Sequence, residues 1–155
     1  MVDQGATAPA FRLQGIDEDG QERVFGLEDF KGRKVVLYFY PRDNTPGCTR
    51  EACDFRDNMA RLASSGAVVL GVSPDSVKSH LGFREKHGLA FPLLSDPDRA
   101  TAAAYGAFGE KKMYGKTTMG IIRSTFLIDE SGRVERAWRG VKVAGHVDEV
   151  LAAIG

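Results

Sequence analysis

Cysteine is scarce in this chain: Cys48 and Cys53 are the only two among 155 residues. Small domains stapled by disulfides carry many more, so this pair does not form a disulfide scaffold. The three histidines, His80, His87 and His146, lie far apart in the sequence, with no cysteine or paired acids nearby. We therefore assign them to the surface or to packing, and we expect neither a metal nor any other cofactor.

An excess of charge is also missing, because 21 Lys and Arg balance 21 Asp and Glu and the formal net charge is zero. Proteins that bind nucleic acid or membrane surfaces use basic runs or cationic amphipathic helices, and the sequence shows neither. No apolar run approaches the ~20 residues that span a bilayer, and the first residues carry no secretory signal. We expect a cytoplasmic protein with no nucleic-acid or membrane partner.

The length and the hydrophobic share of 43% are typical of a soluble globular protein, and they predict one domain over residues 1–155. Signals for strands and helices alternate along the chain. The expected elements, in order, are a hairpin over 11–27 that turns at 17–20, a short helical turn at 28–34, a strand at 35–40, a helix at 47–64, a strand at 67–73, a helix at 76–88, a strand at 91–96, a helix at 99–108, a hairpin over 124–140 and a helix at 146–154. Because β-α-β crossovers place helices on the faces of a sheet, this order predicts an α/β fold: a central mixed sheet flanked by helices, with an N-terminal β-hairpin.

Both cysteines lie in one stretch, FYPRDNTPGCTREACDFRD, directly after a predicted buried strand. Sites in such sheets lie just beyond the C-terminal end of a strand. Thr45 suits a helix N-cap and Pro46 suits the first turn, so Cys48 should lie at a helix N-terminus. Free amides and the helix dipole stabilise a thiolate there, which is the reactive form of cysteine. Pro41 has no N–H, so it can wall this site without competing for hydrogen bonds.

The spacing of Cys48 and Cys53 excludes a bridge on a wound helix. Residues i and i+5 lie about 8–9 Å apart at Cα and point about 140° apart around the axis, whereas a disulfide needs Cα atoms within about 7 Å. So short a loop would stabilise the fold by only about 2 kcal/mol, and unwinding a helical turn costs as much or more. We therefore expect a transient bridge, formed when the first turns unwind, and not a structural disulfide.

The run PRDNTPGC, from Pro41 to Cys48, resembles the peroxiredoxin active-site pattern P-x-x-x-T-x-x-C. A second cysteine five residues later, in TREACDFRD, resembles the Q-type subfamily, also called bacterioferritin comigratory proteins. The likeness continues through KKMYGKTTMGIIRSTFLID, where Arg123 falls at the family's active-site arginine. It extends over essentially the whole chain.

This resemblance implies a thioredoxin-like fold and a thiol peroxidase that reduces hydrogen peroxide and alkyl hydroperoxides in antioxidant defence. Cys48 would be the peroxidatic cysteine that becomes a sulfenic acid, and Cys53 the resolving cysteine that bridges to it. Arg123 and Thr45 would hold the peroxide oxygens, and Pro41 would shield the sulfur. Thioredoxin or a similar dithiol would reduce the bridge. Because the bridge lies within one chain, we expect a monomer.

Several residues keep a second interpretation. Cys48 and Cys53 could be inert thiols that pack in the core, and Arg123 could form only a surface ion pair. Glu51 could orient Arg123, but we expect an ordinary acid of the first helical turn, favoured by the helix dipole.

Two other functions stay open beside the peroxidase. A peroxide-responsive redox sensor or dithiol oxidoreductase would use the same pair of cysteines, and turnover with thioredoxin separates it from a peroxidase. A non-enzymatic holdase would need an exposed apolar patch or a low-complexity tail, and the sequence shows neither. Activity that survives Cys48→Ser would favour the holdase.

Overall fold

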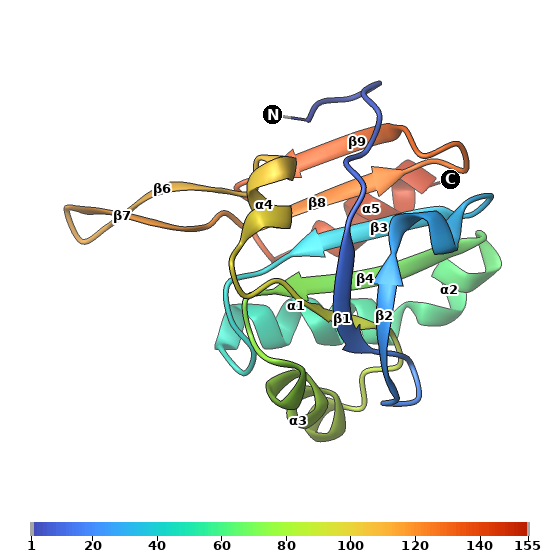
Figure 1. The fold of residues 1–155 in the computed structure, drawn as a ribbon, viewed down its shortest axis with the longest axis horizontal. Helices are drawn as coiled ribbons and strands as arrows, with labels where there is room; N and C mark the ends of the chain where they lie inside the picture. The colour runs from blue at the N-terminus through green and yellow to red at the C-terminus, as the bar shows by residue number, and fades with distance from the viewer. Residues whose placement is uncertain (1, 155) are drawn as a thin grey trace.

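The structure, a computed structural model, describes residues 2–154, apart from the side chain of Met113. A seven-stranded sheet at its centre has the order β2-β1-β5-β4-β3-β8-β9 (Figure 1). Its strands are β1 (Arg12–Ile16), β2 (Glu22–Gly26), β3 (Lys34–Phe39), β4 (Ala67–Ser73), β5 (Leu93–Ser95), β8 (Ser124–Ile128) and β9 (Val134–Arg139). β3, β4 and β5 are parallel to one another, whereas the remaining pairs in the sheet are antiparallel. The predicted α/β fold with a mixed sheet and an N-terminal hairpin is confirmed.

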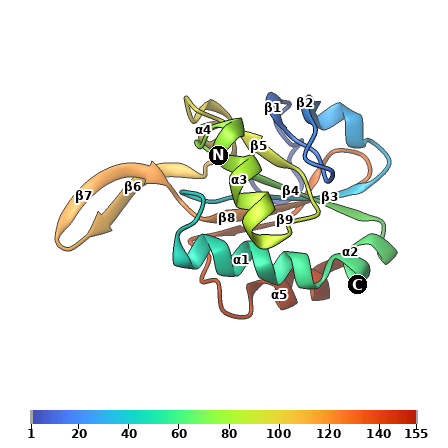
Figure 2. The same ribbon diagram turned by 90° about the horizontal axis from the view of Figure 1, so that it is seen from below.

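Helices cover both faces of this sheet. On one face lie α1 (Pro46–Asp57), α2 (Met59–Ser64), α3 (Val77–His87) and α5 (His146–Ile154), whose apolar side chains join one core cluster. The other face is covered by the short helices η1 (Leu27–Phe30) and α4 (Ala100–Tyr105). Figure 2 shows α1 and α5 together beneath the sheet and α4 on the opposite side. None of the helices within residues 2–154 combines the length and the apolar composition that crossing a membrane requires.

Strand β3 occupies the middle of the sheet, between parallel β4 and antiparallel β8. The side chains of β3 and of Tyr40, which follows it, divide between two core clusters, one on each face: Val36, Tyr38 and Tyr40 on the first, and Val35, Leu37 and Phe39 on the second. The continuous apolar run in the sequence therefore reflects a strand buried on both faces. Pro41 and the cysteine-bearing segment therefore follow β3 at the C-terminal end of the parallel strands.

The single helix predicted over residues 47–64 is divided in two. α1 ends at Asp57 and α2 begins after Asn58, which has φ −114° and ψ 13°. The Asn58 side-chain amide donates to the carbonyl oxygen of Asp54 at 2.8 Å. Asparagine competes in this way for backbone hydrogen bonds, so it favours helix ends over helix interiors. The predicted apolar face survives the break: Ala52, Phe55 and Leu62 are buried.

A hairpin that the sequence analysis did not predict projects from the body of the molecule (Figures 1 and 2). Its strands, β6 (Phe108–Met113) and β7 (Lys116–Ile121), pair with each other and with no other strand among the described residues. Most of its residues are exposed or half-buried, and Tyr114 at the tip is 98% exposed. Strands that bury neither face lack the apolar alternation by which sequence patterns are recognised. The arm returns the chain to Arg123, just before β8.

Gly15 allows β1 and β5 to approach closely. A Cβ atom at Gly15 would lie 2.5 Å from the carbonyl oxygen of Leu93, and a paired strand cannot move its backbone aside. Gly15→Ala should therefore lower the free energy of unfolding by ~2 kcal/mol or more. A Cβ atom at Gly82, on α3, meets nothing within 4 Å, so Gly82→Ala should raise it by up to about 1 kcal/mol. Denaturant titrations measure the free energy of unfolding of both variants. An unchanged value for Gly15→Ala would contradict the close approach of β1 and β5.

Candidate active site

The loop after β3 carries the chain to the start of α1. Asn44 has φ 64°, in the left-handed region that asparagine tolerates better than most residues. Thr45 is the N-cap of α1 and Pro46 its first residue, so Cys48 lies in the first turn. Amides of a first turn have no acceptor within the helix, and the dipole is positive there. The predicted placement of Cys48 is confirmed, and its side chain is buried.

Arg123 reaches Cys48 from the connection between β7 and β8. Its guanidinium is shared: Nη2 donates to Cys48 Sγ at 3.3 Å, and Nη1 donates to Glu51 Oε1 at 2.7 Å. Gly47 leaves room for this approach, because a Cβ atom there would lie 3.2 Å from Nη2. The Arg123 side chain is only 17% exposed, so it does not form a mere surface ion pair. A cation so close to sulfur stabilises the thiolate.

The prediction that Glu51 is an ordinary acid of the first turn is wrong. Glu51 lies beyond the first turn of α1, its side chain is 0% exposed, and it pairs with Arg123. Burial raises the pKa of Glu51 to about 7, although the positive charge of Arg123 acts in the opposite direction. Its other oxygen, Oε2, has no hydrogen-bond partner among the described residues, so the burial is only partly compensated. Glu51 holds Arg123 beside Cys48.

Arg123 keeps its positive charge in this setting. Burial by itself lowers the pKa of Arg123, but the neighbouring Glu51 and Cys48 outweigh burial and raise the pKa above its usual value. A buried cation with two acceptors is positioned by both of them, which fixes the orientation of the planar guanidinium.

Thr45 and Pro41 lie on the loop before α1. The Thr45 hydroxyl donates to the carbonyl oxygen of Arg42 at 2.9 Å and accepts no hydrogen bond from a helix amide. It therefore stiffens the loop from the N-cap position. Pro41 is half-buried just after the end of β3. Contact of either residue with a peroxide stays a prediction.

Cys53 lies on the same helix as Cys48, and both thiols are free. α1 is continuous from Pro46 to Asp57, so the two Cα atoms are about 8–9 Å apart, too far for a disulfide. Cys48 is buried and Cys53 is half-buried. The arrangement is a reduced dithiol on a wound helix.

Comparison with known proteins identifies the family. Residues 4–137 match the AhpC/TSA family, and peroxiredoxin Bcp of Bacillus subtilis is 50% identical over 153 residues, covering 99% of this chain and 95% of its own. The chain belongs to the AhpC/TSA family, as a peroxiredoxin of the Q type. Peroxiredoxin Q of Xanthomonas campestris superposes with a TM-score of 0.82 at 50% identity, covering 92% of this chain and 89% of that one. A cysteine-to-serine mutant of Xylella fastidiosa peroxiredoxin Q gives 0.89 at 42% identity, covering 98% and 94%.

These similarities confirm the thioredoxin-like fold and the thiol peroxidase class that the motif implies. The bacterioferritin comigratory protein of Xanthomonas campestris, studied for alkyl peroxide reduction through a trapped intermediate and ligand complexes, is 49% identical with a TM-score of 0.82, covering 92% of this chain and 89% of that one. The chain is therefore an enzyme, a peroxidase among the oxidoreductases.

A buried polar cluster beside the active-site loop of this peroxiredoxin was missed by the sequence analysis. His80, assigned to the surface or to packing, is 0% exposed, and Asp43 is 5% exposed. His80 Nδ1 and Asp43 Oδ2 lie 2.8 Å apart. No sequence pattern joins positions 43 and 80, because they meet only when α3 packs against the end of the central strands. Asp43 occupies one of the variable positions of the peroxiredoxin motif, so the motif does not single it out.

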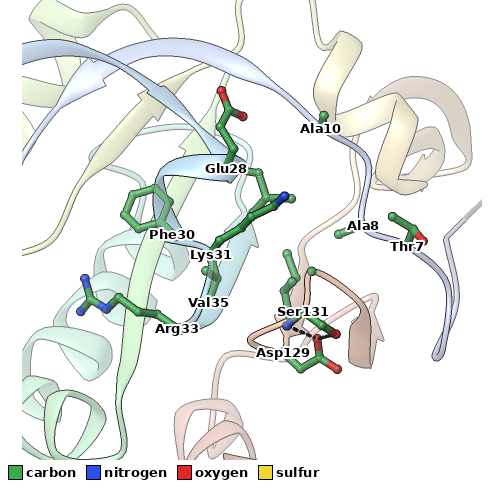
Figure 3. Close-up of a pocket in the computed structure, with 13 residues that line it drawn as sticks. Thr7, Ala8, Ala10, Glu28, Phe30, Lys31, Arg33, Val35, Asp129 and Ser131 are labelled. Atoms are coloured by element: carbon green, nitrogen blue, oxygen red, sulfur yellow. Dashed lines mark hydrogen bonds between the residues drawn. The ribbon is translucent and has the colours of Figure 1, made fainter.

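The cavity in Figure 3 lies at the other end of the sheet from Cys48. Its volume is about 300 Å³, and it is lined by Val35 near the start of β3, whereas Cys48 follows the end of that strand. Of its two carboxylates, Glu28 pairs with Arg12, and Asp129 accepts hydrogen bonds from the Arg133 amide and from the Ser131 hydroxyl and amide. These bonds lower the pKa of Asp129 and hold the turn between β8 and β9. The Asp129 carboxylate is structural, and the cavity is no part of the Cys48 site.

The raised pKa of Glu51 makes the stability of this peroxiredoxin depend on pH. Between the ordinary value of 4.5 and the native value of about 7, the folded state holds a proton that the unfolded state has lost. Stability from this group is therefore fully present below pH 4.5 and is lost as pH rises from there to about 7, by about 3 kcal/mol in all. Glu51→Gln should remove this part of the decline.

Denaturant titrations of the parent and of Glu51→Gln at several pH values between 5 and 8 measure the difference. Glu135→Gln is the matched control, because Glu135 lies outside the site, in a partly exposed ion pair with Lys34. Parallel curves for the parent and Glu51→Gln would contradict the raised pKa.

Proposed function

We propose that this peroxiredoxin reduces hydrogen peroxide and alkyl hydroperoxides with Cys48 as the peroxidatic and Cys53 as the resolving cysteine. One observation carries the proposal: Arg123 Nη2 lies 3.3 Å from Cys48 Sγ while Nη1 is held by Glu51 at 2.7 Å. A fixed cation beside a sulfur at a helix N-terminus suits attack by a thiolate.

In the first step, the Cys48 thiolate attacks one oxygen of the peroxide. A sulfur–oxygen bond forms, the oxygen–oxygen bond breaks, and the leaving alkoxide or hydroxide takes a proton and departs as alcohol or water. Cys48 is oxidised to a sulfenic acid. Arg123 is placed to stabilise negative charge that develops on the breaking bond, and Glu51 keeps it there.

In the second step, the first turns of α1 unwind and the Cys53 thiolate attacks the Cys48 sulfur. A disulfide forms, and the hydroxyl group leaves as water after taking a proton. A thioredoxin-like dithiol then reduces the bridge by two thiol–disulfide exchanges and becomes a disulfide itself. The half-buried position of Cys53 supports access for this exchange once the helix has opened.

Thr45 and Pro41 complete the proposed site. Thr45, fixed through Arg42, would present its oxygen to the peroxide, and Pro41 would shield the Cys48 sulfur from water. The intramolecular bridge supports a monomer, and reduction by a dithiol suits the cytoplasm. Both the oligomeric state and the compartment stay predictions.

Oxidation of the reduced protein by one equivalent of hydrogen peroxide tests the pair of cysteines. Both thiols and two hydrogens should be lost within seconds, and peptide mapping should find a bridge between Cys48 and Cys53. Cys53→Ser should stop at sulfenic or sulfinic acid, and Cys48→Ser should show no turnover. The intact mass and a free-thiol count report each product.

Repeated turnover with thioredoxin, thioredoxin reductase and NADPH separates a peroxidase from a redox sensor, which would respond once and stop. An active Cys48→Ser, or two thiols that survive peroxide for minutes, would overturn the assignment.

Removal of Arg123 should slow the first step by about 10²–10³-fold, which is typical when one group that stabilises developing charge is lost. Arg123→Ala leaves Glu51 buried without its partner, so the double variant Arg123→Ala with Glu51→Gln separates catalysis from misfolding. Arg136→Ala is the matched control, because Arg136 is exposed and stacks on Trp138. Stopped-flow oxidation of Cys48 measures the rate, and a loss of less than tenfold in both Arg123 variants would contradict this role.

A further inference from the structure

The buried cluster around Asp43 and His80 adjoins the loop that leads to Cys48, and the peroxiredoxin motif does not explain this cluster. We propose that these are positioning residues: they anchor the loop before α1 and thereby set how often the first turns of that helix unwind. This inference rests on the proposed function, because unwinding matters only if Cys48 and Cys53 must bridge.

Asp43 is the centre of the anchor. Its carboxylate accepts hydrogen bonds from the Tyr40 hydroxyl at 2.6 Å and from the Ser79 hydroxyl at 2.8 Å, and its Oδ2 lies 2.8 Å from His80 Nδ1. Its backbone amide donates to Asp75 Oδ2 at 2.7 Å. Both the side chain and the main chain of one loop residue are therefore held.

His80 is bound on both sides of its ring. Nε2 faces the carbonyl oxygen of Leu94 at 2.8 Å, and a carbonyl can only accept, so Nε2 carries a hydrogen. Nδ1 faces Asp43, which already accepts from two hydroxyl groups. The 2.8 Å contact between Nδ1 and Asp43 Oδ2 is a hydrogen bond inside a buried site, where it is stronger than it would be in water. Such a bond is hard to replace once broken, because water does not reach the groups.

The anchor is tied to the rigid part of the fold. Ser79 and His80 belong to α3, Leu94 to β5, and Asp75 is held by Ser73 at the end of β4 through a 2.7 Å hydrogen bond. These elements form the C-terminal edge of the parallel strands, which does not need to move for Cys48 to reach Cys53.

The same cluster has the spacing of a metal site, since ligand atoms of Asp43, Asp75 and His80 lie within 4.8 Å of one another. The hydrogen-bond pattern argues against this use. The Asp43 amide hydrogen and the Ser73 hydroxyl both point at Asp75 Oδ2, and an amide cannot give up its hydrogen to admit a cation. The cluster is better described as a saturated hydrogen-bond network.

The segment that must move begins immediately after Asp43. Asn44, with φ 64°, and the N-cap Thr45 connect Asp43 to the turn that carries Cys48. While Asp43 is fixed, winding this turn orders only a few residues. If Asp43 were free, the whole loop would have to be ordered again each time, and conformational entropy would favour the unwound state.

The two steps of the reaction depend differently on the equilibrium between the wound and the unwound first turn of α1. Attack on peroxide needs the wound helix, in which Arg123 contacts Cys48, whereas the bridge to Cys53 needs the unwound helix. If the wound state predominates, weakening the anchor multiplies the small unwound population and hardly changes the large wound one. Bridge formation should then accelerate while the first step is nearly unchanged.

Asp43→Asn replaces one oxygen acceptor of the anchor by an amide nitrogen and keeps its size. We expect bridge formation after oxidation to become about tenfold faster, with the first step within about twofold of the parent. Because a second peroxide would react at the same wound site beside Arg123, the peroxide concentration that converts half of Cys48 to sulfinic acid should rise by a similar factor. Quenched-flow oxidation with mass analysis measures all three quantities in the full chain.

Ser79→Ala, which removes one hydrogen bond at the edge of the cluster, should give a smaller shift of the same sign, about threefold. This variant keeps the test decisive if Asp43→Asn does not fold. His87→Asn is the matched control for the helix: His87 is half-buried at the end of α3, outside the cluster, so both rates should match the parent.

Gly15→Ala destabilises the fold between β1 and β5, away from α1; if it accelerated bridge formation as much as Asp43→Asn, the effect would be a general loss of stability, and this outcome would overturn the anchor. So would folded variants whose rate of bridge formation is unchanged or lower. If the parent protein itself forms no bridge between Cys48 and Cys53, the proposed function fails, and the anchor fails with it. If the parent turns over normally and only the variants depart from the expected rates, the anchor is wrong and the proposed function stands.

Discussion

The site depends on the two-pronged contact of one arginine. Arg123 spans Cys48 and Glu51, at 3.3 and 2.7 Å, and thereby joins α1 to the strand that lies beside β3. Burying this ion pair costs solvation that only good geometry recovers, and the raised pKa of Glu51 records the part that is not recovered. Gly47 eases this contact, because a Cβ atom there would press on the guanidinium at 3.2 Å. The hydrogen bond from Arg123 to the Cys48 sulfur thus depends on three features. β3 and β8 lie side by side, α1 begins at this point, and position 47 is a glycine.

The same helix must be wound for one step and unwound for the next. α1 has 12 residues, a length at which isolated helices are only marginally stable in water, and the break at Asn58 prevents α2 from extending it. Its stability comes mainly from the buried side chains Ala52 and Phe55 and from the ion pair of Glu51. The first turn contributes Cys48 and Gly47, and it has fewer such contacts. A local opening there can therefore occur without loss of the core.

The loop before α1 contrasts with that turn. Asp43 is held by hydrogen bonds to Tyr40, to α3 and to Asp75, whereas Cys48 is held chiefly by packing and by Arg123. Rigid and labile segments are only a few residues apart, and Asn44 and Thr45 form the joint between them. A boundary this sharp confines the movement to the residues that the chemistry uses. It also explains why a polar cluster occupies a buried site that apolar side chains could have filled.

The sequence alone determined the order of the seven central strands along the chain, the buried strand at β3, the helix start at Thr45 and Pro46, and the excluded static bridge between Cys48 and Cys53. These follow from local periodicity, from capping preferences and from helix geometry, which act over a few residues. It also placed Arg123 in the site, through a motif. Only the tertiary structure decided that Glu51 is buried against Arg123, that Asp43 meets His80, and that residues 108–121 form a projecting hairpin. Such outcomes depend on burial and on contacts between distant segments, and neither leaves a periodic trace in the chain.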